Sequence, residues 1–119
     1  KIGNGMITHF PEFTSPFWNM SRNSDGVTSK KIDVILGGME TIGSAERSTS
    51  PHEMRHMFSD ISEGGYAKLL YDLFGQERVD AELDEFLKHN FIPRFGGGIG
   101  VTRMISAMEN IGIDPMHPY

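Results

Sequence analysis

The 119-residue sequence contains no cysteine. It therefore has neither a disulfide framework nor thiolate chemistry, and we expect a cytoplasmic protein. It also lacks an apolar run approaching ~18 residues and a signal-like start, so we expect no membrane contact. With a net charge of −5, it offers no basic patch for nucleic acid. The length suits one domain, and because the chain opens with Lys1 rather than methionine, we expect part of a longer protein.

Glycine is concentrated at 96–100, where four of five residues lack a side chain. A ligand can approach such a backbone closely. Apolar residues at i, i+3, i+4 and i+7 predict a helix directly afterwards: Val101, Met104, Ile105 and Met108. Arg103 falls in its first turn, where the helix dipole disfavours a cation. A bound phosphate would resolve this conflict, because free N–H groups and a guanidinium can hold it together. The alternative is a glycine-rich turn followed by a solvated arginine.

Gly37-Gly38 lies between two apolar runs and predicts a β-hairpin with a two-residue turn. In that pairing Asp33 and Glu40 share one face as diagonal neighbours, roughly 7–8 Å apart. Two carboxylates at that separation can share a hard divalent cation, directly or through water. The alternative is a solvated polar face. Arg47 falls on the opposite face unless a bulge shifts the alternation, and we predict such a bulge at Gly43-Ser44.

The other patterns predict further antiparallel strands and amphipathic helices, and therefore an α+β fold with an antiparallel sheet flanked by helices packed against one face. Ser50-Pro51 has the residue types of a helix start. Apolar spacing predicts core-facing stripes on two more helices. The expected elements are strands at 6–10 and 15–22, a turn at 23–26, strands at 31–36 and 39–48, and helices starting at 51 and covering 66–74 and 79–87.

The segment 52–56 matches the zinc-peptidase pattern His-Glu-x-x-His. His52 and His56 stand at i, i+4 and could bind zinc, with Glu53 as the general base. No third ligand is obvious, although Glu77 or His89 can be proposed. A zinc metallopeptidase is thus a remote alternative, and a solvated helix face is the other interpretation.

Two features together are more specific: Asp33, Glu40 and Arg47, each seven residues apart, and the run from Gly96 to Arg103. They resemble the C-terminal half of the catalytic domain of class II aminoacyl-tRNA synthetases of the aspartyl, asparaginyl and lysyl group, with motif 3 at 96–104. The resemblance runs from about Phe17 to Glu109 and implies that residues 1–119 form this partial catalytic core.

The resemblance also implies roles for individual residues. Asp33 and Glu40 would hold Mg²⁺, Arg103 would be the catalytic arginine on the terminal phosphate, and Arg47 would bind the amino-acid side chain. The implied ATP-binding residues are Glu40, Gly100, Val101, Thr102 and Arg103. A guanidinium at position 47 suits a carboxylate or amide oxygen and repels lysine, so the resemblance is to the aspartyl and asparaginyl branch.

The implied reaction is activation of aspartate or asparagine by ATP to an aminoacyl-adenylate. Transfer RNA would bind through regions outside this chain, and a homodimer would form through other missing segments. Thr102 replaces the usual acidic residue and Arg94 the usual histidine. A small hydroxyl at position 102 is also similar to asparagine synthetase A, so a paralogue that uses ammonia is the alternative. Motifs 1 and 2 are absent from the 119 residues, and we expect this chain alone to be inactive.

Overall fold

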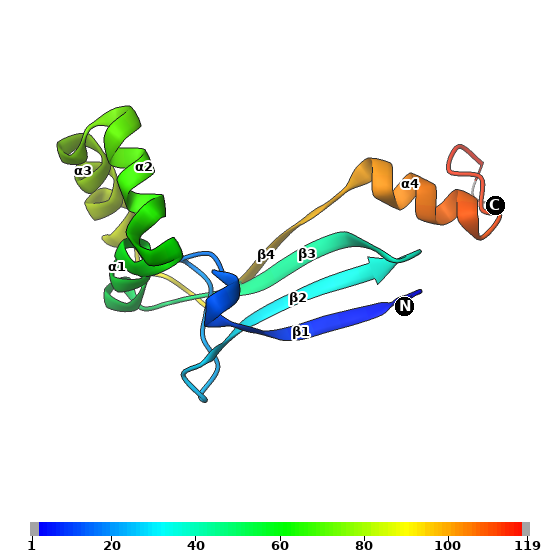
Figure 1. Cartoon of the computed structure of the whole chain (residues 1–119), viewed down its shortest axis with the longest axis horizontal. Coiled ribbons are helices and arrows are strands. Elements are labelled where there is room, and N and C mark those ends of the chain that lie inside the picture. Colours follow the sequence, from blue (N-terminus) through cyan, green and yellow to red (C-terminus); the bar gives the residue numbers. More distant parts are fainter. Residues whose placement is uncertain (1–2, 118–119) are drawn as a thin grey trace.

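The computed structural model describes residues 3–117 as a four-stranded antiparallel sheet with helices beyond both of its ends (Figure 1). The strand order follows the sequence, and the molecule is elongated, with extents of 52 × 33 × 27 Å. The expectation of an α+β fold with an antiparallel sheet flanked by helices is confirmed. The strands are β1 (Gly5–Pro11), β2 (Thr28–Leu36), β3 (Met39–Arg47) and β4 (Arg94–Ile99).

The prediction that the helices pack against one face of the sheet is wrong. They lie at the ends of the sheet, because of where they join the strands. Three helices and a short 3-10 turn connect the end of β3 to the start of β4, and α4 continues directly from the end of β4 (Figure 1). They are α1 (Pro51–Asp60), η2 (Ile61–Gly64), α2 (Gly65–Phe74), α3 (Gln76–Leu87) and α4 (Val101–Asn110), with η1 (Glu12–Thr14) after β1.

Local sequence signals account for several of these boundaries. Gly37 and Gly38 have φ values of 59° and 80° and make the two-residue turn between β2 and β3. Ser50 caps α1, because its side chain accepts a hydrogen bond from the Glu53 backbone N–H at 3.2 Å. Gly75, at φ 85°, ends α2. The predicted hairpin, helix start and helix stop are therefore confirmed.

The strand predicted at 15–22 is wrong. This segment is a loop that touches the sheet only through isolated bridges, Met20 with Arg47 and Arg22 with Ser29. Ser15 has a left-handed φ of 52°, which is incompatible with an extended strand. Trp18 instead packs among the helices, so tertiary burial outweighs the local β propensity.

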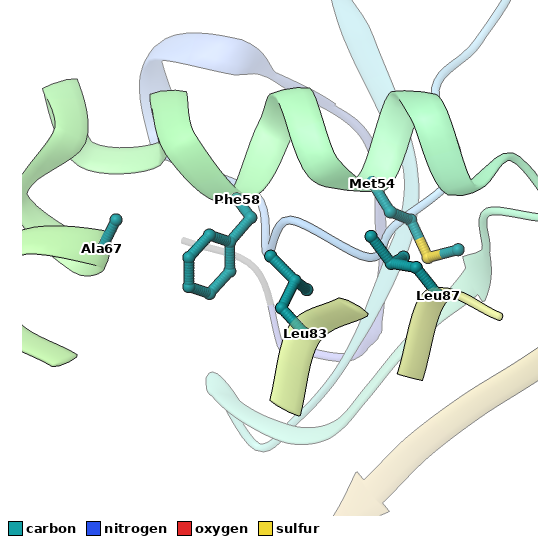
Figure 2. Close-up of a cluster of buried hydrophobic side chains, with 5 residues drawn as sticks. All are labelled: Met54, Phe58, Ala67, Leu83 and Leu87. Carbon is teal, nitrogen blue, oxygen red and sulfur yellow. The ribbon is translucent and has the colours of Figure 1, made fainter. Parts of the chain in front are cut away.

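The main hydrophobic core lies in the helical unit and not under the sheet. It consists of Met54, Phe58, Ala67, Leu83 and Leu87 (Figure 2). Each large apolar side chain buried there contributes about 1.5–3 kcal/mol of transfer free energy. Trp18 joins this core through edge-to-face contacts with Phe58 and Phe86, at ring-centroid distances of 5.6 and 5.7 Å.

Part of the expected helical core stripe is exposed. Leu69 and Leu73 of α2 expose 56% and 64% of their surface, and Val101 at the start of α4 exposes 68%. The prediction that α2 carries a core stripe is therefore wrong for these two leucines and for Phe74, which is 52% exposed, because residues 3–117 provide no layer to cover that side. No helix within the described part of the chain is long and apolar enough to cross a membrane.

Candidate functional site

The register between β2 and β3 contains the predicted type of irregularity, at a different position. Leu36 pairs with Met39 and Ile35 with Glu40, as expected from the two-residue turn. The next pair is Val34 with Ile42, which leaves Thr41 as the extra residue of a bulge. The bulge predicted at Gly43-Ser44 therefore lies two residues earlier, and Asp33 faces Gly43 instead of Ile42.

This bulge brings the sequence-predicted residues of β2 and β3 to one face. A methyl group on Gly43 would lie 2.9 Å from Glu40 Oε1 and 3.5 Å from Asp33 Oδ1, so both carboxylates border the same point. Arg47 lies four residues after Gly43, and alternation therefore returns it to that face. The Arg47 guanidinium lies against Gly96 of β4, because a methyl group on Gly96 would be 2.9 Å from Arg47 Nε.

The two carboxylates differ in exposure, since Asp33 is buried and Glu40 is exposed. They leave a space that a side chain at position 43 would fill, and carboxylate oxygens are the donors that Mg²⁺ and Ca²⁺ prefer. The pair therefore fits a hard divalent cation. Lys31, which the sequence reasoning missed, forms an ion pair with Asp33 and lies 3.8 Å above the centre of the Phe10 ring. Its position two residues before Asp33 on the same strand was the available signal.

Arg47 carries an unneutralised charge on this face. Its Nη1 donates to the side-chain oxygen of Asn19 at 3.2 Å, and it forms no ion pair with a carboxylate within residues 3–117. Arg94 is its direct cross-strand partner on β4, and Arg94 Nη1 donates to the Ser48 carbonyl at 3.2 Å. Two like charges facing each other across a sheet are destabilising by themselves, which favours an anion nearby.

Arg103 lies beside the bulge. The Gly100 N–H donates to the Thr41 carbonyl at 2.8 Å and attaches the start of α4 to β3. From the first turn of α4, Arg103 Nη1 donates to the Glu40 carbonyl at 2.7 Å. Gly100 occupies the N-cap position without a side-chain cap, so the first backbone N–H groups of α4 remain available to an anion, together with the exposed Arg103. Val101 and Thr102, the other predicted nucleotide residues, are exposed in the same turn.

The glycines at 96–98 form part of strand β4 rather than a bend. None of them has a positive φ, so backbone conformation does not require glycine there. Gly98 pairs with Gly43, and a methyl group on Gly98 would meet nothing within 4 Å. The open space over Gly98 adjoins the two carboxylates, because cross-strand partners share a face.

The residues of the His-Glu-x-x-His pattern at 52–56 have structural contacts in and before α1. Glu53 accepts a hydrogen bond from the Ser48 hydroxyl at 2.5 Å and so helps to fix the start of α1. His52 and His56 are exposed, and His56 Nε2 lies 3.3 Å from Asp60 Oδ2, one turn further along the helix. Among the described residues no group of three histidine, cysteine, aspartate or glutamate side chains is placed to hold a metal ion.

Comparison with known proteins gives a consistent result. Residues 4–112 match the family model of "tRNA synthetases class II (D, K and N)". No curated protein sequence matches the chain significantly. Similar solved structures include asparaginyl-tRNA synthetase from Entamoeba histolytica in complex with asparaginyl-adenylate, with 19% identity over 88% of this chain and 22% of that one, at a TM-score of 0.63.

Two further structures show the same extent of similarity. Asparaginyl-tRNA synthetase from Pyrococcus horikoshii has 15% identity over 90% of this chain and 23% of its own, with a TM-score of 0.64. Aspartyl-tRNA synthetase from Entamoeba histolytica has 18% identity over 94% and 22%, also at 0.64. At these identities the likeness concerns the fold, and the chain spans about a fifth of the length of the structures it matches.

Proposed function

Because the chain belongs to the class II tRNA synthetases (D, K and N), we propose that it contributes to ATP-dependent activation of aspartate or asparagine. Residues 1–119 would be the C-terminal half of the catalytic domain, with motif 3 at 96–104. The observation that carries the proposal is the common face of β2 and β3, which presents Asp33, Glu40 and Arg47, with Arg103 bonded to the same strand. Aminoacyl-adenylate formation needs these charges in one place, because it joins two anionic reactants.

ATP would lie between the strand face and the start of α4. Arg103 would bind the terminal phosphate, with Gly100, Val101 and Thr102 beside the nucleotide. The uncapped N–H groups of α4 support this assignment, since a helix start and a guanidinium together form an anion site. Gly98 of β4 has no side chain at the point where the nucleotide would approach the backbone.

Asp33 and Glu40 would hold Mg²⁺, which neutralises phosphate charge when it is bound. Glu40 would thereby contribute to the ATP site as well. Lys31 is the ion-pair partner of Asp33 and would have to release it when the metal binds. The chain's own task is to keep the two carboxylates on one side of the sheet, and the missing side chain at Gly43 lets both approach the same point.

Arg47 would bind the side-chain carboxylate of aspartate or the amide oxygen of asparagine. Its charge is not neutralised by a carboxylate within residues 3–117, which supports a role with an acceptor group from outside the chain. The positive charge of Arg47 would repel an amino acid with a cationic side chain, such as lysine. Positioning of the bound reactants, rather than a general base, would supply the rate enhancement.

The proposal extends to the acceptor of the activated amino acid, to the oligomeric state and to the cellular compartment. Transfer RNA would accept the activated amino acid through parts of the protein outside residues 1–119, and a homodimer would form through such parts. The reaction would take place in the cytoplasm. A paralogue that passes an aspartyl group to ammonia is the alternative, favoured by Thr102, and formation of free asparagine would identify it.

ATP–pyrophosphate exchange in the intact protein tests the proposal. Arg103→Ala should abolish exchange, because the terminal phosphate loses its main cationic partner. Arg47→Ala should weaken amino-acid binding by about 2–5 kcal/mol and leave ATP binding nearly unchanged. Near-normal exchange in the first variant would remove the phosphate role of Arg103. Equal losses for both ligands in the second would remove the amino-acid role of Arg47.

A further inference from the structure

One side chain outside the predicted site contacts the Arg47 guanidinium, namely Asn19 in the loop after η1. The distance from Arg47 Nη1 to Asn19 Oδ1 is 3.2 Å, and both residues are half-buried. On its other side the guanidinium lies against Gly96, where a methyl group would be 2.9 Å from Nε and 3.1 Å from Nη2. Asn19 and the bare backbone of Gly96 therefore bound the same guanidinium.

Asn19 is itself held firmly. Its carbonyl accepts the Ser48 N–H at 2.9 Å, and the next bridge joins Met20 to Arg47. Its other neighbour, Trp18, is anchored by edge-to-face contacts in the helical core. The loop is thus fixed to β3 by backbone bonds and to the helices by an aromatic ring, so the backbone that carries the Asn19 side chain has a defined position relative to Arg47.

The contact of Arg47 with a neutral oxygen differs from those of three other arginines in the described chain, whereas Arg94 and Arg103 likewise donate to neutral backbone carbonyls. Arg22, Arg55 and Arg78 each pair with a carboxylate. Arg47 receives a neutral amide oxygen instead, which orients the guanidinium and does not cancel its charge. A carboxylate in the same place would orient it equally well but would compete with an anionic ligand.

We propose that Asn19 is a positioning residue for amino-acid binding: it orients Arg47 and preserves its full positive charge for the substrate side chain. The inference rests on the proposed function for the role of Arg47 and adds a residue that the sequence patterns did not indicate. It also connects the helical core to the site, since Trp18 fixes the loop that carries Asn19.

Amino-acid and ATP KM values from ATP–pyrophosphate exchange test the proposal in the intact protein, with aspartate and asparagine each tried as substrate. Asn19→Ala should raise the amino-acid KM about tenfold, the equivalent of one charge-assisted hydrogen bond, with the ATP KM unchanged. Asn19→Asp keeps the side-chain shape and should raise it further, with a larger effect on aspartate than on asparagine. Asn110→Asp adds the same charge at an exposed position on α4 and should change neither value.

Arg47→Ala, measured in parallel, separates the two ideas. If it leaves the amino-acid KM unchanged, the proposed function of Arg47 is wrong. If it raises that KM and both Asn19 variants behave like the wild type, only the inference about Asn19 is wrong. Equal increases in the KM values for ATP and amino acid, or a lower melting temperature that accounts for the loss in both variants, would also overturn it in favour of a merely structural asparagine.

Discussion

The substitution Gly98→Ala separates a glycine required by the fold from one required by a ligand. Gly98 has neither a positive φ nor any atom within 4 Å of the position where a side chain would begin. Alanine should therefore fit the free protein without strain. By restricting the unfolded chain it should even stabilise the fold, by about 0.4–1 kcal/mol.

Ligand binding should respond in the opposite direction. If the nucleotide approaches the strand at Gly98, the added methyl group occupies space that the ligand needs, and such overpacking typically costs about 1–3 kcal/mol. This corresponds to a rise of about 5- to 150-fold in the ATP Kd. The neighbouring Gly97 provides the contrast: a methyl group there would lie 2.6 Å from the Gly43 carbonyl oxygen and 2.7 Å from Ser44 Cβ. Gly97→Ala should therefore destabilise the sheet by about 1–3 kcal/mol.

The assay combines thermal melting of both variants with ATP titration by calorimetry. The expected pattern is a Gly98→Ala protein with unchanged or higher Tm and weakened ATP binding, beside a Gly97→Ala protein with lowered Tm. A Gly98→Ala protein that melts normally and binds ATP as tightly as the wild type would refute a nucleotide over β4.

Three further predictions concern single side chains. Asp33→Asn should shift the magnesium dependence of exchange to higher Mg²⁺ concentrations, because one of two carboxylates is lost; an unaltered magnesium titration would contradict the metal assignment. Ser50→Ala should lower the free energy of unfolding by about 1 kcal/mol, measured by urea denaturation, because the cap to the Glu53 N–H is removed. Hydrogen bonds from the Thr28 hydroxyl and from nearby backbone N–H groups lower the pKa of Asp25, so its contribution to stability is complete above its ordinary pKa and is lost as the pH falls through the lowered value. In acid urea titrations Asp25→Asn should weaken this dependence, and identical curves would argue against it.

The β2–β3 hairpin followed from local sequence, because the Gly37-Gly38 turn fixes its first two pairs. Strand β4 was not predicted, because its run of glycines lacks β propensity. Helix α1 was readable from Ser50-Pro51, since cap chemistry acts within four residues. The common face of Asp33 and Glu40 could be deduced from the same turn, although the bulge at Thr41 pairs Asp33 with Gly43 instead of Ile42.

Interactions between distant segments could not be predicted from local sequence. The position of the bulge depends on how β3 pairs with both β2 and β4, and a single strand does not contain that information. The loop with Trp18 and Asn19 looked like a strand because its aromatic residues favour extended structure, whereas burial of the indole in the helical core decides its path. Contacts such as Asn19 with Arg47 join residues 28 positions apart and leave no spacing pattern in the sequence.

The extra residue at Thr41 also limits how this strand can change in length. Glu40 and Arg47 are separated by an odd number of positions, and only the bulge turns both toward the same side. Loss of the bulged residue itself would restore regular pairing and leave an even separation, so both side chains would still share a face. Loss of a residue elsewhere between them, with the bulge retained, would point the guanidinium to the far side of the sheet. A change of one residue in β3 is therefore tolerable only where it also adds or removes a bulge, so the bulge ties the length of the strand to the side chains it presents.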